Sequence, residues 1–312
     1  MSMPKELKRV KKVDTKTTGL PYDNNHDPSN IIKYNELYYF WYTQHMNNRP
    51  FSAFKYCKIM YKTSADGIHW SDGKDALLPS KDGWDNCGVL TAYVVPYEGK
   101  FYLFYIGVDN NFCPKTNPVR GCGAAIADHP EGPWTRFTDK QILYPTKGAW
   151  DDEACDDITV LNKDGKWLMY YKGRASGLPA TRTQVGLATS DRITGPYKKY
   201  EGNPLIKGHA FAIWPYKHGF LYLAGLNDEN TKDTRDIDYW NIGKRSLFWS
   251  EDGITFEPCC EFPNVSVGLY TGIVHDGTQD DVSKFWGLMV GTKLYGLRRY
   301  IKRFDFCLEE ES

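Results

Sequence analysis

Short apolar runs rich in tyrosine, phenylalanine and tryptophan recur along the whole chain, and turns containing Gly, Asn or Asp separate them. The clearest pair of runs is 158–161 and 166–172, which flank the turn 162–165, Asn-Lys-Asp-Gly. Asp-Gly between two β-rich runs is a strong local signal of a β-hairpin. No segment has a helical period of useful length, so the sequence predicts an all-β protein.

One four-strand pattern repeats along the chain at a spacing of about 50–60 residues. Such a repeat is typical of a β-propeller, in which each blade is a small antiparallel sheet. A β-sandwich also has many short strands, but its spacing would not repeat as a four-strand unit. We therefore predict a single five-bladed β-propeller domain over residues 1–312, with blades at about 20–80, 81–145, 146–204, 205–263 and 264–308.

Charge and composition narrow the range of partners. Lys plus Arg equals Asp plus Glu at 39 each, so nothing electrostatic argues for a nucleic acid or an acidic membrane. No apolar run approaches the length of a transmembrane helix. The 22 tyrosines and 10 tryptophans suit both strands and carbohydrate-facing surfaces.

The eight cysteines lack paired Cys-x-x-Cys spacing, so no structural zinc site is expected from the sequence. The N-terminal segment 1–14 is basic without an apolar core, and we do not expect it to act as a secretory signal. These features predict free buried thiols and a cytoplasmic or periplasmic location.

In a propeller, the innermost strands line the central channel, so residues at their starts meet at one end of it. These residues are His26-Asp27, 85–91, Asp156-Asp157, His209 and Tyr270-Thr271. Glycoside hydrolysis needs two groups that face one pocket, a base that activates water and an acid that protonates the leaving oxygen. Asp27 could instead cap a turn, although the five-blade pattern favours the catalytic role, and His209 could be a core histidine or a ligand for a metal or water.

Three motifs, in order along the chain, resemble those of known propeller glycosidases. HDPSN at 26–30, followed by YYFWYT, resembles the first-blade motif of the five-bladed glycoside hydrolases of families 43 and 117. The acidic cluster before DGKWLMYYKGR is similar to their third-blade motif. GHAFAIWPYKHG at 208–219 looks closest to family 117, whose pattern there is Gly-His-Glu followed by Trp-Pro-Tyr. The resemblance runs over roughly residues 20–300.

The resemblance implies a role for three residues. Asp27 matches the general base, and Asp157 matches the Asp that orients substrate or tunes the pKa of the acid, with Asp156 competing for that position. His209 matches the unusual histidine general acid of family 117. An imidazole suits this role because its ordinary pKa, near 6.5, leaves a useful protonated fraction near neutrality.

Further residues in or near these motifs are candidates for contact with substrate. Trp84, Trp150 and Trp214 could stack on sugar rings or pack within blades. Residues 151–153 lie on an approach loop, where solvated charge is the default interpretation. Arg174, like Lys172, is read as a salt-bridge partner that could also touch substrate. The remaining candidate substrate contacts are Thr91, Glu153, Asp156, Tyr270 and His275.

The fourth-blade motif departs from family 117 at Ala210, where the family has Glu. Either Glu153 or Asp156 supplies the missing carboxylate, or the substrate has changed, or activity is lost, or the alanine is engineered. The family's N-terminal helical region, which exchanges between subunits, has no counterpart in the sequence, and the oligomeric state stays open. The resemblance requires no cofactor, and it allows a metal ion in the channel, for which no ligand set can be read.

Three functions remain. The first is an exo-acting, inverting glycosidase that removes a terminal 3,6-anhydro-galactose-type or related α-linked sugar from agar or carrageenan oligosaccharides. The second is a family 43-like arabinosidase or xylosidase, which needs a Glu acid at the fourth blade; Glu131-Gly132-Pro133 falls on an outer turn of the second blade instead. The third is a carbohydrate-binding propeller without activity.

Overall fold

The structure is a computed structural model that describes residues 3–4, 9–13, 25–46, 56–108, 120–178, 182–209, 211–225, 245–261, 271–273, 284–293 and 298–309. Within these residues the chain forms β-strands and no α-helix, so the all-β prediction is confirmed. No helix in this part of the chain is long and apolar enough to cross a membrane. None of the seven cysteines in this part of the chain is in a disulfide; four are buried, as predicted, and three are half-buried.

The first sheet is antiparallel, with strand order β2-β4-β5-β6 and with β3 paired to β4. Its strands are β2 (Asn25–His26), β3 (Ile31–Tyr34), β4 (Leu37–His45), β5 (Cys57–Ser64) and β6 (Lys74–Leu77).

The second sheet has nine strands and consists of two antiparallel units. One parallel pair, Ala154 with Arg120, joins the two units. The first unit contains β7 (Gly88–Tyr97), β8 (Lys100–Val108), β9 (Arg120–Ala127) and β10 (Thr135–Arg136). The second contains β11 (Ala154–Lys163), β12 (Lys166–Arg174), β13 (Gln184–Ser190), β14 (Lys198–Lys199) and β15 (Ile206–Lys207). The hairpin predicted around the turn 162–165 is the β11–β12 pair.

Two four-stranded sheets complete the fold. The third contains β16 (Phe211–Tyr216), β17 (Gly219–Gly225), β18 (Arg245–Ser250) and β19 (Glu257–Glu261). The fourth contains β20 (Thr271–Ile273), β21 (Lys284–Lys293), β22 (Arg298–Glu309) and β1 (Arg9–Val13). Because β1 pairs with β22, the N-terminal strand completes the C-terminal sheet.

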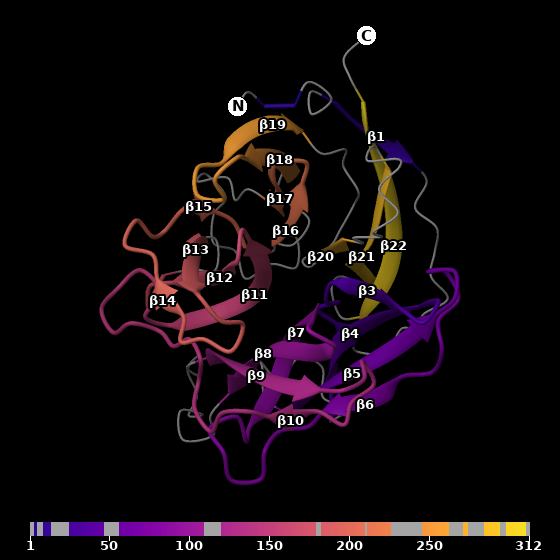
Figure 1. Cartoon of the computed structure of the whole chain (residues 1–312), viewed down its shortest axis with the longest axis vertical. Helices are drawn as coiled ribbons and strands as arrows, with labels where there is room; N and C mark the ends of the chain where they lie inside the picture. The colour runs from indigo at the N-terminus through magenta and orange to yellow at the C-terminus, as the bar shows by residue number, and fades with distance from the viewer. Residues whose placement is uncertain are drawn as a thin grey trace.

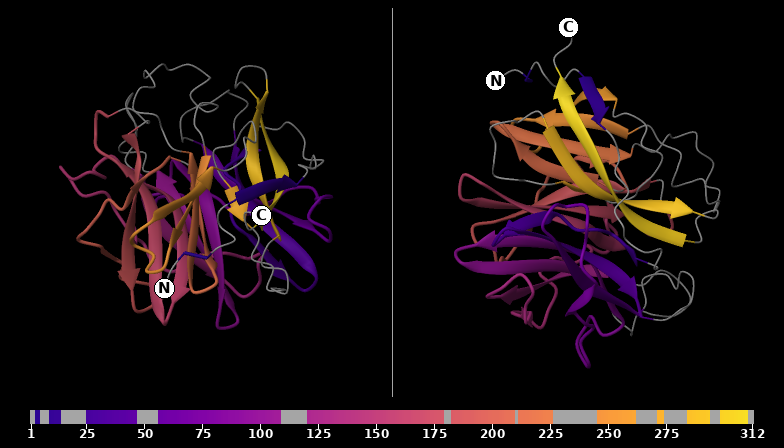
Figure 2. Two further views of the ribbon diagram at one scale, coloured as in Figure 1. Left: turned by 90° about the horizontal axis from the view of Figure 1, so that it is seen from above. Right: turned by 90° about the vertical axis from the view of Figure 1, so that its right-hand side faces the viewer.

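The sheets are arranged around a common centre in chain order (Figure 1). Strand β7 contacts β11, β11 contacts β16 and β16 contacts β20, while β2 contacts β22. The side views show the strands of the successive sheets fanned around the centre, with β1 and β22 next to each other (Figure 2). The arrangement is that of a propeller, and it brings strands that are far apart in the sequence to one central region.

The core lies between neighbouring sheets. Trp41 of β4 packs in one cluster with Leu103 of β8 and edge-on against Trp134. Tyr170 of β12 packs with Tyr222 of β17, and its hydroxyl donates to the carbonyl of Gly253 at 2.8 Å. Full burial of each large apolar side chain stabilises the fold by roughly 1.5–3 kcal/mol, so these contacts hold adjacent sheets together.

Trp84 and Trp150 occupy matching positions in the two units of the nine-stranded sheet. Trp84 stacks on Tyr105 with a centroid separation of 6.1 Å. Trp150 lies against Tyr171, and a Cβ atom on either Gly173 or Gly186 would come within 2.6 Å of its ring. The glycines therefore make room for the indole, and packing accounts for both tryptophans, which is the alternative that the sequence left beside sugar stacking.

The aspartate after each of these tryptophans is buried, which corrects the expectation of solvated charge at Asp151. Asp85 accepts hydrogen bonds from Tyr105 Oη and Arg136 Nε, each at 2.8 Å. Asp151 is 1% exposed and accepts from Tyr171 Oη at 3.0 Å and from Lys199 Nζ at 2.5 Å. The same tyrosine–carboxylate–cation group recurs in both units. It ties the start of each unit to its second strand, β8 or β12, and to its outer strand, β10 or β14.

Candidate functional site

Three residues at the start of the inner strands share a left-handed backbone conformation. Their φ angles are 53° at Asp27, 47° at Thr91 and 45° at Asp157. Non-glycine residues rarely adopt positive φ, and for a β-branched residue such as threonine it is a genuine outlier. In β7 and β11 these positions fall within register irregularities of β-bulge type, which re-aim side chains next to functional sites.

Asp27, the predicted base, is held from two sides. Its side chain is 4% exposed, and its Oδ2 lies 2.5 Å from His26 Nδ1. Thr91 Oγ1 donates to the same oxygen at 3.5 Å, and the Thr91 N–H donates to Thr43 Oγ1 at 2.9 Å. The structure thus places Thr91, a predicted substrate contact, beside Asp27 as a positioning residue.

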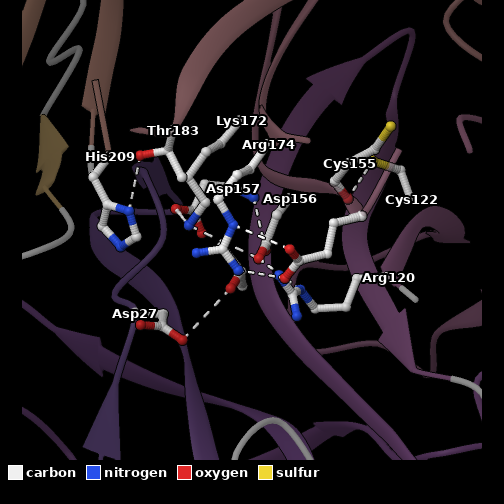
Figure 3. Close-up of polar contacts among 12 residues, drawn as sticks. Asp27, Arg120, Cys122, Cys155, Asp156, Asp157, Lys172, Arg174, Thr183 and His209 are labelled. Atoms are coloured by element: carbon white, nitrogen blue, oxygen red, sulfur yellow. Dashed lines mark hydrogen bonds and ion pairs between the residues drawn. The ribbon is translucent and has the colours of Figure 1, made fainter. Parts of the chain in front are cut away.

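Asp156 and Asp157 form a buried ionic network with two cations from neighbouring strands (Figure 3). Asp156 Oδ2 lies 2.9 Å from Arg120 Nε and 3.8 Å from Lys172 Nζ. Asp157, which is 5% exposed, forms a short ion pair with Lys172 and donates its backbone N–H to Asp156 Oδ1 at 2.9 Å. Two carboxylates therefore face two cations, which offsets the cost of burying four charges.

The network pushes the pKa values of the two carboxyl groups apart. Burial raises the pKa of Asp157 well above its usual range, against the attraction of Lys172 and with further upward contributions from Asp156 and Asp27. Burial also works to raise the pKa of Asp156, but the charges of Lys172 and Arg120 outweigh it and lower that pKa. Neighbouring carboxyl groups with separated pKa values are typical of acid–base sites.

Asp157 also presents an oxygen to the site. Its Oδ1 is buried and has no hydrogen-bond partner among the residues that the structure describes. A buried acceptor without a partner is costly, and a ligand hydroxyl would relieve that cost. Asp157 can therefore receive a hydrogen bond from a bound sugar.

His209 follows β15, and Figure 3 shows it coming from a different segment than Asp27 and Asp157. The ring is half-buried, and its Nδ1 lies 3.0 Å from the hydroxyl of Thr183. A threonine hydroxyl can donate to a neutral imidazole or accept from an imidazolium. Thr183 thus holds the ring through Nδ1 in either protonation state.

Glu153 and Arg174 are partners of each other. Arg174 Nε donates to Glu153 Oε2 at 3.2 Å, and its terminal nitrogen forms a shorter bond to Oε1. Glu153 is buried, so the expectation of solvated charge is wrong for it as well. Because both of its oxygens are engaged, Glu153 is not a spare acid in this arrangement.

Of the remaining residues singled out in the sequence, one lies in the core and the others lie outside the described residues. Trp214 of β16 is 1% exposed and packs against Phe285 of β21 and Phe306 of β22, so packing accounts for it too. Tyr270, His275 and Ala210 lie outside the described residues.

A cavity of about 660 Å³ lies toward the opposite end of the inner strands. Its lining comes from 30–33, 35–36, 93–97 and 160–162, which follow Asp27, Thr91 and Asp157 along the chain, together with Trp167. None of the predicted site residues lines it. This cavity is therefore separate from the cluster of Asp27, Asp157 and His209.

Sequence reasoning missed Arg120 and Thr183 as members of this region. Arg120 and Thr183 carry no motif of their own, and the contacts that they make depend on pairing between separate strands. Lys172 was interpreted as a salt-bridge partner that could also touch substrate, and the available signal was its place in the predicted hairpin, across from the acidic pair Asp156-Asp157.

A family model describes most of this region. The model of the glycosyl hydrolases family 32 N-terminal domain matches residues 21–206, more than half of the chain, including Asp27 and Asp157. The chain belongs to this family. No curated protein matches it in sequence.

Solved structures of glycoside hydrolases are similar in fold. A family 117 glycoside hydrolase from the marine bacterium Zobellia galactanivorans has a TM-score of 0.75 and 24% identity, over 98% of this chain and 92% of that one. A thermostable family 43 glycoside hydrolase has a TM-score of 0.65 and 13% identity, over 93% and 92%. An α-L-arabinofuranosidase from Clostridium thermocellum has a TM-score of 0.56 and 15% identity, over 85% and 82%. The resemblance to the glycosidases of families 117 and 43 is thus confirmed at the level of the fold.

Proposed function

We propose that this family 32-domain chain is an exo-acting, inverting glycoside hydrolase on a five-bladed propeller. The observation that carries the proposal is the pair Asp27 and Asp157. They come from separate sheets, occupy equivalent left-handed positions and are both buried, and the charge of Asp27 contributes to the raised pKa of Asp157. Membership of a glycosyl hydrolase family and the fold of its structural neighbours support the reaction class.

The proposed reaction is a single displacement by water. Asp27 takes a proton from water as the water attacks the anomeric carbon, and the bond to the leaving sugar breaks on the opposite face. His209, as the imidazolium, gives its Nε2 proton to the leaving oxygen while Nδ1–H donates to Thr183 Oγ1. Asp157 binds a sugar hydroxyl through its Oδ1 and adjusts the field around the acid.

The proposed substrate is an agar or carrageenan oligosaccharide with a terminal 3,6-anhydro-galactose-type or related α-linked sugar. Its support is the Gly-His and Trp-Pro-Tyr pattern at 208–216 and the structural likeness to the family 117 enzyme of a marine bacterium. The five-blade count is supported by five successive antiparallel units, two of which share the nine-stranded sheet.

A second candidate is an arabinosidase or xylosidase of the family 43 type. It is favoured by the likeness to the α-L-arabinofuranosidase, whose fold covers 85% of this chain. This reaction would use a carboxylic acid instead of His209 as the proton donor. The buried Glu153 is held by Arg174, which weighs against Glu153 in that role.

One assay separates these candidates from a binding protein. The full chain is incubated with neoagaro- and neocarrageenan-oligosaccharides, and in parallel with aryl arabinofuranosides and xylosides, and the first-formed anomer is followed by NMR. We expect release of one terminal sugar from the algal oligosaccharides with inverted configuration. Retention of configuration would overturn the mechanism, and release from the pentosides alone would favour the second candidate. Calorimetric binding of an oligosaccharide without release of sugar would identify a carbohydrate-binding propeller.

A further inference from the structure

Three adjacent strands bring two histidines and a cysteine to one face of the first sheet. His45 of β4 is directly opposite Cys57 of β5. His26 of β2 is opposite Thr43, two residues before His45 on the same strand. Directly paired residues share a face, and so do alternate residues along a strand. His26, His45 and Cys57 therefore project from the same side of the sheet.

The potential ligand atoms are close together. His26 Nε2 lies 3.0 Å from His45 Nε2, and His45 Nδ1 lies 3.4 Å from Cys57 Sγ. One ligand atom from each of the three residues lies within 4.8 Å of the others. Among the residues that the structure describes, this is the one group of His, Cys, Asp and Glu side chains that could hold a metal ion.

From this geometry we infer that His26, His45 and Cys57 bind a zinc-class transition-metal ion. Imidazole and thiolate are the ligands of Zn²⁺, whereas Mg²⁺ and Ca²⁺ prefer oxygen. Ligand atoms in a tetrahedral zinc site lie about 3.3–3.8 Å apart, given zinc–nitrogen and zinc–sulfur distances of about 2.0–2.3 Å. The two short contacts involve different nitrogens of His45, and one ion binds only one of these nitrogens. With one ligand atom per residue the three atoms lie within 4.8 Å of one another, so the more distant ligand must move toward the other two to reach that spacing, which leaves a fourth position for water.

Burial favours a built site over a surface cluster. Cys57 and His26 are buried and His45 is half-buried. Two ligands come from strands paired along their full length, and this pairing fixes their backbones before any ion arrives. Such preorganisation lowers the ordering cost of binding.

The metal-free alternative is a chain of neutral hydrogen bonds. Cys57 S–H donates to His45 Nδ1, His45 Nε2–H donates to His26 Nε2, and His26 Nδ1–H donates to Asp27. Each ring nitrogen is used once in this chain. In both arrangements His26 Nδ1–H donates a hydrogen bond to Asp27. The arrangements differ in whether a metal ion or a hydrogen bond joins the two histidines.

The position of His26 links the metal to the proposed base. Metal-bound histidines commonly donate their other ring N–H to a carboxylate, and His26 Nδ1 lies 2.5 Å from Asp27 Oδ2. This link rests on the proposed function. The metal site itself does not, since binding is measured without substrate, and a failed glycosidase assay leaves it intact.

The test uses the reduced full chain after treatment with a chelator. Titration with Zn²⁺ is followed by calorimetry and by metal analysis after dialysis, and Co²⁺ serves as a coloured substitute. We expect one ion per chain, and a thiolate-to-cobalt charge-transfer band in the wild-type protein. Cys57→Ser should abolish this band, and Cys57→Ser and His45→Ala should each weaken Zn²⁺ binding about tenfold or more.

The matched control is Cys122→Ser, because Cys122 is an equally buried free thiol outside the group. It should bind Zn²⁺ and give the cobalt band as the wild type does. Absence of the band from wild-type protein, or equal Zn²⁺ affinity in folded Cys57→Ser, would overturn the proposal in favour of the hydrogen-bonded chain. The cobalt spectrum of the wild type decides the matter even where a variant fails to fold.

Discussion

Lys172 forms its short ion pair with Asp157, although the register of the hairpin places Lys172 opposite Asp156. Adjacent residues of a regular strand point to opposite faces of the sheet. The irregularity between Asp156 and Thr159, with a φ of 45° at Asp157, removes that alternation. Both carboxylates therefore contact one ammonium group, and the site gains two acids with different pKa values from a single strand.

Asp27→Asn tests the proposed base. The amide keeps the shape of the side chain and its contacts with His26 and Thr91 but cannot accept a proton from water. We expect kcat to fall by about 10²–10⁴-fold, with a melting temperature close to that of the wild type. Asp191→Asn, an exposed carboxylate paired with Lys166, is the control and should keep full activity. Normal turnover by Asp27→Asn would show that the base lies elsewhere.

His209→Gln tests the proposed acid. Loss of the imidazolium should reduce kcat by about 10²–10⁴-fold on natural oligosaccharides and far less on substrates with a good leaving group. The alkaline limb of the pH–rate profile, which reports deprotonation of the acid, should disappear at the same time. Thr183→Val should weaken kcat through the orientation of the ring, and Thr183→Ser should restore it. An equal loss on both classes of substrate would argue that His209 only binds sugar.

Lys172→Met tests the ionic network. Removing this cation leaves Asp156 with Arg120 alone and Asp157 without its ion pair. Breaking a buried ion pair in this way should lower the free energy of unfolding by about 3–5 kcal/mol, measured by urea denaturation. Lys166→Met on the same strand removes an ion pair with side chains 50% and 87% exposed and should cost less than about 1 kcal/mol. Similar losses in the two variants would contradict the network.

The pH dependence of stability should separate the two carboxyl groups. The pKa of Asp156 is lowered on folding, so its contribution is present above the unfolded pKa near 3.9 and is lost as the pH falls through the folded pKa. The pKa of Asp157 is raised, so its contribution is present below about 3.9 and is lost as the pH rises through the folded pKa.

Asparagine variants make this difference measurable. Relative to the wild type, Asp157→Asn should gain free energy of unfolding as the pH rises from acid to neutral. Relative to the wild type, Asp156→Asn should lose free energy of unfolding as the pH rises through the acid range. Urea denaturation at a series of pH values provides the measurement, and parallel curves for the two variants would contradict the opposite shifts.

The sequence alone determined the class of fold and the strand starts that carry the candidate site residues. Aromatic runs separated by Gly, Asn and Asp turns predict antiparallel strands, because these patterns are local to each segment. The repeat placed Asp27, Asp157 and His209 at corresponding ends of strands, and the motifs at 26–30 and 208–219 pointed to glycosidases. These predictions depended on residues close together in the chain.

Only the tertiary structure decided which side chains meet. Trp84 and Trp150 pack beside glycines of other strands, and Asp151 is buried by Tyr171 and Lys199. The contacts of His45 depend equally on strand pairing, since His26 and Cys57 reach it from separate strands. Pairing register, bulges and packing between sheets join residues that are distant in sequence, and no local pattern encodes those distances.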